Sequence, residues 1–166
     1  AMNEFAKADA PSHHKTPIET YLWSRGVALP NDCISVRWRK AWQFKGDKTT
    51  AAIMALISDP ITLKPLGLHL TYLHPNNTKW GRGYFGVKQN LWLDDDDKLH
   101  KRAGVIMLSP MAAVTSAGTL GIGEGIETAL SVRRISGNEN LPVWAAGDSG
   151  NLAKFEPPSY IRTLII

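Results

Sequence analysis

The sequence contains a single cysteine, Cys33, among 166 residues. One cysteine cannot form an internal disulfide, and it excludes zinc sites built from several cysteines. Asp32 and Ile34 flank it just before a strand-like run, and no neighbouring group would activate a thiolate. We therefore expect a half-buried structural thiol and no zinc.

Long apolar runs are also missing. The longest, from Ala51 to Ile57, is far shorter than a membrane-spanning helix. No signal peptide opens the chain, and Ala1 ahead of Met2 resembles an expression remnant, so we expect a cytoplasmic protein with no membrane partner. The apolar share of 43% is ordinary for a globular protein, and the length allows one well-cored domain.

Two nucleotide-binding motifs are absent. No GxxxxGK[ST] loop occurs, which excludes a nucleotide-hydrolysing motor of the P-loop class. Gly121, Gly123 and Gly125 imitate a dinucleotide fingerprint, but the third glycine comes one position early and Glu124 stands where pyrophosphate would lie. Residues 147–150, Gly-Asp-Ser-Gly, copy the letters around a serine-protease nucleophile, yet they fit a helix cap between a strand and a helix.

Turn signals divide the first part of the chain into two regions. Residues 1–15 are polar and contain adjacent histidines at 13 and 14 that fit a solvated segment better than a metal site, so we predict a flexible lead-in. Residues 16–117 are predicted to form an α+β region that opens with a helix from Thr16 to Gly26. Antiparallel strands without intervening helices follow at 34–39, 51–58, 67–74 and 105–108.

Alternating apolar and polar residues at 34–39 and 67–74 argue for strands with one buried and one solvated face. The long polar stretch between the last two strands contains four aspartates at 94–97, which fit a charged loop better than a cation site.

Residues 118–166 have a different pattern, in which strands alternate with helices. Strands are expected at 120–123, 143–146 and 162–166, with helices at 126–135 and around 151–155. This order is typical of parallel pairing with crossover helices. The predicted fold class is therefore α/β, or α+β overall. It has an antiparallel N-terminal sheet region followed by an incomplete doubly wound parallel unit.

The most informative residue is Glu124, which ends the predicted strand 120–123. Open α/β sheets bind ligands at the carboxyl ends of their strands, so Glu124 is the candidate catalytic and metal-binding residue. Gly123 and Gly125 on either side would let a phosphate or metal approach the backbone. Glu127 fits the role of an anion that stabilises the amino end of the following helix, and this role stays open for Glu124 too. Asp148 ends the next strand and could face the same crevice as Glu124.

Several segments resemble the Toprim domain of phage- and plasmid-type DNA primases and primase-helicases. They are 123–130 (GEGIETAL), 142–146 (PVWAA), 152–155 (LAKF) and 161–166 (IRTLII). Upstream, residues 21–26, 52–59 and 67–73 look like the region that precedes Toprim in the same proteins.

The resemblance implies a specific chemistry. Glu124 would act as general acid/base in phosphodiester chemistry or help to hold the metal, and an Asp-x-Asp pair after the third strand would bind Mg²⁺. That pair is expected beyond Ile166, and the Cys/His zinc segment of many such primases is not in this sequence. The implied protein is a DNA primase fragment, inactive alone, whose parent makes RNA primers for phage or plasmid DNA replication.

DNA template and nucleotides are the expected partners, together with a replicative helicase domain or protein. A Toprim nuclease or a topoisomerase-like enzyme remains open, because the glutamate motif does not fix the reaction. The net charge of +4 permits a nucleic-acid partner without demanding one.

An alternative function rests on cations interleaved with aromatic residues, a pattern typical of surfaces that bind phosphates and stack on bases. It would make the chain a non-catalytic module for single-stranded nucleic acid. A solvated strand face with buried tryptophans is the simpler explanation. The candidate residues are Arg37, Trp38, Arg39, Lys40, Trp42, Lys79 and Arg82.

Overall fold

The computed structural model describes residues 2–11, 16–44, 48–74, 88–93 and 103–166. The strands are β1 (Val36–Phe44), β2 (Lys48–Ser58), β3 (Pro65–Leu73), β4 (Lys88–Trp92), β5 (Val105–Ile106), β6 (Thr119–Gly123), β7 (Val143–Ala145) and β8 (Thr163–Ile165). The helices are α1 (Met2–Ala6), α2 (Pro17–Ser24), α4 (Met111–Ala117), α5 (Ile126–Ile135) and α6 (Ser149–Lys154).

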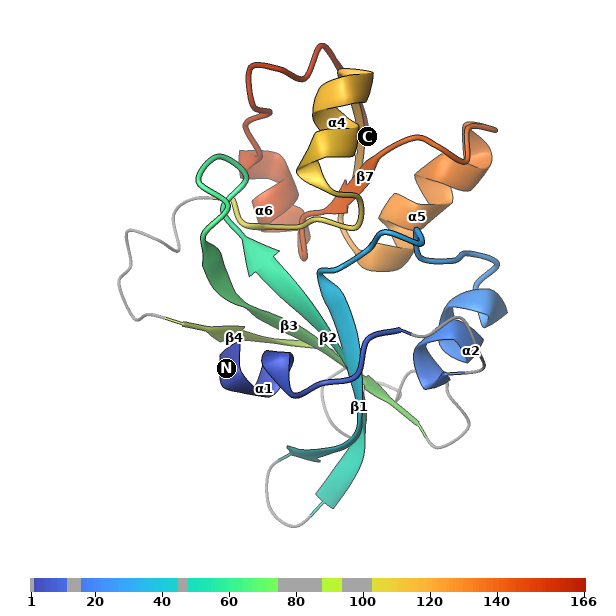
Figure 1. Cartoon of the computed structure of the whole chain (residues 1–166), viewed down its shortest axis with the longest axis vertical. Coiled ribbons are helices and arrows are strands. Elements are labelled where there is room, and N and C mark those ends of the chain that lie inside the picture. Colours follow the sequence, from blue (N-terminus) through green and yellow to red (C-terminus); the bar gives the residue numbers. More distant parts are fainter. Residues whose placement is uncertain (1, 12–15, 45–47, 75–87, 94–102) are drawn as a thin grey trace.

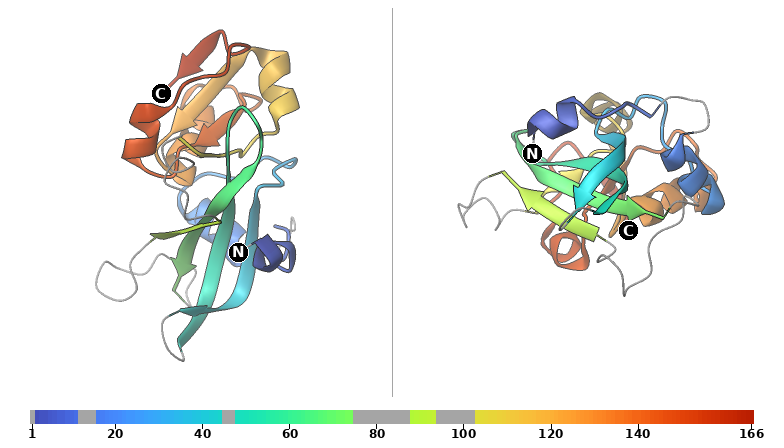
Figure 2. Two further views of the ribbon diagram at one scale, coloured as in Figure 1. Left: turned by 90° about the vertical axis from the view of Figure 1, so that its left-hand side faces the viewer. Right: turned by 90° about the horizontal axis from the view of Figure 1, so that it is seen from below.

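One mixed sheet runs through the part of the chain that the structure describes. Seven of its eight strands follow the order β4-β3-β2-β5-β7-β6-β8, and the eighth, β1, pairs with β2 off that path. The long antiparallel strands occupy one end of the molecule, and the short parallel strands occupy the other, with α4, α5 and α6 around them (Figures 1 and 2). The α/β class predicted from the sequence is confirmed.

The first half is an antiparallel meander, as predicted. β2 pairs with β1 on one side and with β3 on the other, and β4 pairs with β3. Ile53 and Ala55 of β2 belong to one core cluster, whereas Ala52 and Met54 belong to another. Because β2 is buried on both faces, its sequence is a continuous apolar run rather than an alternation.

β3 lacks the solvated face that its alternating sequence predicted. All residues from Leu66 to Leu73 are buried, and His69 and Thr71 are each only 3% exposed. Both faces of this sheet region are covered. The α1 segment packs on one face through Phe5 and Ala8. His69 lies opposite Ala55, whose core cluster contains residues of α2 and α5.

Residues 2–11 differ from the predicted flexible lead-in. Residues 2–6 form α1, and Phe5 is only 6% exposed. Asp9 and Trp38 exchange backbone hydrogen bonds of 2.9 and 3.0 Å. One buried aromatic ring and one backbone bridge therefore order a segment whose polar composition suggested none. The two histidines at 13 and 14 lie outside the described residues.

The second half contains the predicted parallel strands. β6 pairs in parallel with both β7 and β8, and α5 has the predicted bounds. Helix α4 was not predicted. It begins directly after Pro110, ends at Gly118 with a left-handed backbone (φ 61°), and buries Val114 in the core beneath β6 and β7.

β5 joins the two halves, which the sequence had suggested were separate regions. It pairs antiparallel with β2 through Ile106 and Ile57, and antiparallel with β7 through Ile106 and Ala145. Residues 16–117 and 118–166 therefore share one continuous sheet. Among the described residues, no helix has the length and apolarity needed to cross a membrane.

Candidate functional site

The carboxyl end of β6 holds the candidate site. Glu124 follows the last residue of β6 and its side chain is exposed, while Gly125 caps the start of α5. Asp148 follows β7, the parallel neighbour of β6. The Ala146 amide donates a 2.9 Å hydrogen bond to the Gly123 carbonyl, which holds the two strand ends together. Glu124 and Asp148 thus lie at the same edge of the sheet, as predicted.

Gly123 serves the packing of a helix on a strand rather than the approach of a ligand. A Cβ at this position would lie 2.6 Å from the backbone nitrogen of Ala129 and 2.9 Å from its Cα. Gly123 itself is buried, and the space that its missing side chain leaves is filled by the backbone of α5. The sequence had suggested a gap for phosphate or metal there, and the close helix explains why the gap is absent.

Glu127 is tied to the structure. The Tyr21 hydroxyl donates a hydrogen bond to Glu127 Oε1, which links α2 to the first turn of α5. Tyr21 is only 1% exposed, and its burial, together with the hydrogen bond to Glu127, raises the pKa of the phenol far above its ordinary value. Glu127 therefore has a packing role between two helices, alongside the favourable position at a helix amino end.

Asp148 is a helix cap, which is the role the sequence favoured for it. Its Oδ1 accepts a 2.8 Å hydrogen bond from the Asn151 amide at the start of α6. The Asn151 side chain in turn donates to the Ala146 carbonyl, 3.2 Å away, just after β7. Asp148 is therefore held in place at the edge that also carries Glu124.

The described residues contain no ready-made cluster of metal ligands. No group of three or more His, Cys, Asp or Glu side chains among them has the geometry to hold a metal ion. Glu124 and Asp148 supply two carboxylates, and one of them is already engaged as a cap. Mg²⁺ usually keeps several waters and is bound through one or two carboxylates together with substrate phosphates.

Cys33 is more buried than the sequence suggested, with 9% of its surface exposed. Its Sγ lies 3.7 Å from the Ser35 hydroxyl, and burial raises the pKa of the thiol. A thiol that resists ionisation is a poor nucleophile and a poor metal ligand, which fits the structural role predicted for it.

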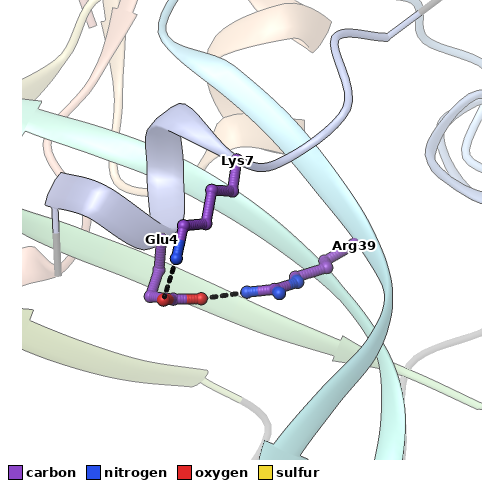
Figure 3. Close-up of polar contacts among 3 residues, drawn as sticks. All are labelled: Glu4, Lys7 and Arg39. Atoms are coloured by element: carbon purple, nitrogen blue, oxygen red, sulfur yellow. Dashed lines mark hydrogen bonds and ion pairs between the residues drawn. The ribbon is translucent and has the colours of Figure 1, made fainter.

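The two arginines of β1, Arg37 and Arg39, have partners within the chain, and Figure 3 shows those of Arg39. One Arg37 nitrogen lies 3.1 to 3.4 Å from the carbonyl oxygens of Phe5, Ala6 and Ala8, and the guanidinium stacks over the Phe5 ring. Arg39 pairs with Glu4, which also contacts Lys7 at 3.7 Å. Both arginines therefore hold the α1 segment on the sheet.

The two tryptophans of the predicted nucleic-acid surface lie on opposite faces of the sheet. Trp38 packs against the core on the α2 side, whereas Trp42 packs against the core on the α1 side. A register shift between Arg39 and Trp42 causes this separation, because an extra residue reverses the side on which the following side chains point. Lys40 is exposed. Lys79 and Arg82 lie outside the described residues.

A groove near the opposite end of α5 was not predicted from the sequence. Trp23 at the end of α2 and Arg133 at the end of α5 both line it, and its volume is about 740 Å³. The signals available in the sequence were a tryptophan in the last turn of one helix and an Arg133-Arg134 pair in the last turn of another.

Comparison with known proteins identifies a family but no characterised relative. No curated protein and no solved structure matches this chain. A family model described as a domain of unknown function, DUF7146, matches residues 2–84, which is half of the sequence. The match begins at α1, includes β1 to β3 and ends before β4, so Glu124 and the parallel strands lie outside it. The chain belongs to the DUF7146 family of domains of unknown function.

Proposed function

We propose that this chain is part of a Toprim-type DNA primase, which makes RNA primers on a DNA template in a Mg²⁺-dependent reaction. The observation that carries the proposal is the position of Glu124. It is an exposed carboxylate at the carboxyl end of β6, between the parallel strands β7 and β8 and directly before α5. The resemblance of residues 123–130 to the Toprim motif adds the reaction class.

The proposed role of Glu124 is that of a general acid/base in phosphodiester chemistry. Its exposure leaves the carboxylate free to reach a bound nucleic acid, whereas Glu127 and Asp148 are engaged with Tyr21 and the α6 amino end. A positioned acid/base contributes about 10²- to 10⁴-fold to a rate. No group of three or more metal-ligating side chains is present among the described residues, so we derive no step through the metal.

Primer synthesis is the direct test. The gene product that carries this sequence is incubated with single-stranded DNA, ribonucleotides and Mg²⁺, and the RNA products are separated by length. Glu124→Gln removes the proton-transfer group and keeps the shape, so we expect a rate at least about 100-fold lower. Glu156→Gln is the matched control, because Glu156 is also exposed. We expect it to leave the rate unchanged.

Two results would overturn the proposal. Absence of primers from the wild-type gene product excludes a primase, and full activity of Glu124→Gln excludes the role of this residue. Cleavage or rejoining of a labelled DNA strand, lost in Glu124→Gln, would instead identify a Toprim nuclease or topoisomerase-like enzyme. The same gene product binding single-stranded DNA without any reaction would favour the non-catalytic module.

A further inference from the structure

A groove separates the end of α2 and its following loop from the carboxyl end of α5. We call it the α2–α5 groove. The aromatic and polar residues that line it are Trp23, Asn31, Arg133, Arg134, Glu139 and Asn140. The two helices lie next to each other in the views of Figures 1 and 2, and they share one core cluster. Glu124 lies before the opposite end of α5, whose ten residues extend about 15 Å, so the groove is distinct from the candidate active site.

The groove has a fixed shape because its walls are tied together. Arg134 donates a hydrogen bond from Nη1 to the Gly26 carbonyl, which joins α5 to the loop after α2. Gly26 has a left-handed backbone (φ 70°), and Val27 turns back to donate its amide to the Leu22 carbonyl at 3.1 Å. Leu130 and Val27 belong to the central core beneath the groove. A ligand therefore meets a preformed site of about 740 Å³, within the range of small-molecule pockets.

Trp23 presents an unusual amount of aromatic surface. It is 57% exposed, although its neighbours Tyr21 and Leu22 are almost completely buried. The tryptophan ring is the largest apolar side chain and offers a flat face on which a nucleic-acid base stacks. An exposed ring on the wall of a preformed groove is thus a site for a planar ligand.

Arg133 supplies a cation beside that ring. Its guanidinium has no hydrogen bond or ion pair among the described residues, in contrast to Arg134, Arg37 and Arg39. The amides of Asn31 and Asn140 add donors and acceptors at the rim. Glu139 on the same rim disfavours a small free anion such as inorganic phosphate and suits a ligand that also carries N–H donors.

We infer that the α2–α5 groove binds a nucleotide, with the base stacked on Trp23 and the phosphate paired with Arg133. The ligand is either a free nucleotide or one unit of a single strand, since both offer a base and a phosphate. This inference goes beyond the proposed function and does not depend on Glu124 or on primer synthesis.

The test measures binding of a labelled oligothymidylate of about ten nucleotides to the full chain by fluorescence anisotropy. Thymidine monophosphate competes in a second arm. We expect Trp23→Ala and Arg133→Ala each to weaken binding roughly tenfold, and Trp23→Phe to keep most of it. Arg133→Ala alone should also lower the dependence of log K on log salt by about one. Lys64→Ala, which removes an exposed cation from the β2–β3 turn, is the charge-matched control and should bind like the wild type.

The outcomes separate clearly. Competition by the mononucleotide at concentrations near its own Kd supports a free-nucleotide site, and binding of the oligonucleotide alone supports a site for a strand. Failure of the wild-type chain to bind either ligand at low salt overturns the inference. Wild-type affinity in both Trp23→Ala and Arg133→Ala overturns it too, as does an equal loss in Lys64→Ala. Circular dichroism confirms that each variant is folded.

Discussion

The Tyr21 hydroxyl donates a hydrogen bond to Oε1 of Glu127, and this contact between residues 106 positions apart in the sequence joins two helices. α2 precedes the antiparallel strands, whereas α5 follows β6 in the parallel unit. The pair therefore connects the beginning and the end of the fold on one face of the sheet.

Removing this hydroxyl should cost stability. We expect Tyr21→Phe to lower the free energy of unfolding by about 1–2 kcal/mol, because a hydrogen bond to a charged acceptor is lost while the ring stays in the core. Urea denaturation measures the change. Tyr160→Phe is the control, since that hydroxyl donates to the weakly accepting sulfur of Met111 and should cost less. Equal losses in the two variants would contradict a special role for the Tyr21–Glu127 contact.

Alkaline pH should destabilise the protein. Burial raises the pKa of Tyr21, Tyr72 and Cys33 above the values that these groups have in an unfolded chain. The folded state therefore holds these protons more tightly than the unfolded chain does. Each group contributes its full stabilisation of the fold at pH values below its unfolded pKa, and this contribution is lost as the pH rises through its pKa in the folded state. We expect the unfolding midpoint in urea to fall from about pH 9 upward. Tyr21→Phe should make this fall less steep, and an unchanged slope would contradict the assignment to Tyr21.

Gly123 should tolerate no side chain. Alanine there would bring its Cβ within 2.6 Å of the α5 backbone, which has to move away from β6. We expect Gly123→Ala to lower the free energy of unfolding by about 1–3 kcal/mol, the usual cost of overpacking. Gly150→Ala is the matched control. It lies in α6, its Cβ would meet only the Asp148 side chain at 3.2 Å, and we expect a neutral or slightly stabilising effect.

Arg37 should control the attachment of the N-terminal segment. Its guanidinium reaches the three carbonyl oxygens of Phe5, Ala6 and Ala8, so Arg37→Ala should release α1. Hydrogen exchange of the Asp9 amide, which donates to Trp38, reports the release, and we expect it to speed up about tenfold. Arg39→Ala should have a smaller effect, because its partner Glu4 lies in a partly exposed ion pair. A larger effect of Arg39→Ala would reverse the roles assigned to the two arginines.

Much of the parallel unit was predictable from the sequence, because its signals are local. Apolar runs, a helical pattern over 126–135 and glycines near the helix ends defined β6, α5 and β7 closely. The position of Glu124 at the end of β6 followed from those elements alone. α4 was not predicted, because the proline that precedes it is also a typical end of a strand.

The remaining features depend on contacts between distant residues. Residues 2–11 are ordered because Phe5 packs in the core and because Arg37 donates hydrogen bonds to carbonyl oxygens at the end of α1. Neither contact has a local signature in the sequence. The separation of Trp38 from Trp42 depends on one extra residue in β1. The packing role of Gly123 has no local signature for the same reason, since only the docked α5 shows what fills the space beside it.

The two-residue strand β5 has a consequence for the order in which the protein folds. Its hydrogen bonds reach back to β2 and forward to β7, so β5 finds its second partner only after the β6–α5–β7 segment has been made. During synthesis the β1–β2–β3 meander is complete much earlier, and only the end of β2 at Ile57 and Ser58, beyond its pairing with β1, still lacks a neighbour on that side. Closing the sheet at β5 is therefore a late, non-local step, and the unpaired end of β2 is the surface that a chaperone would have to shield until then.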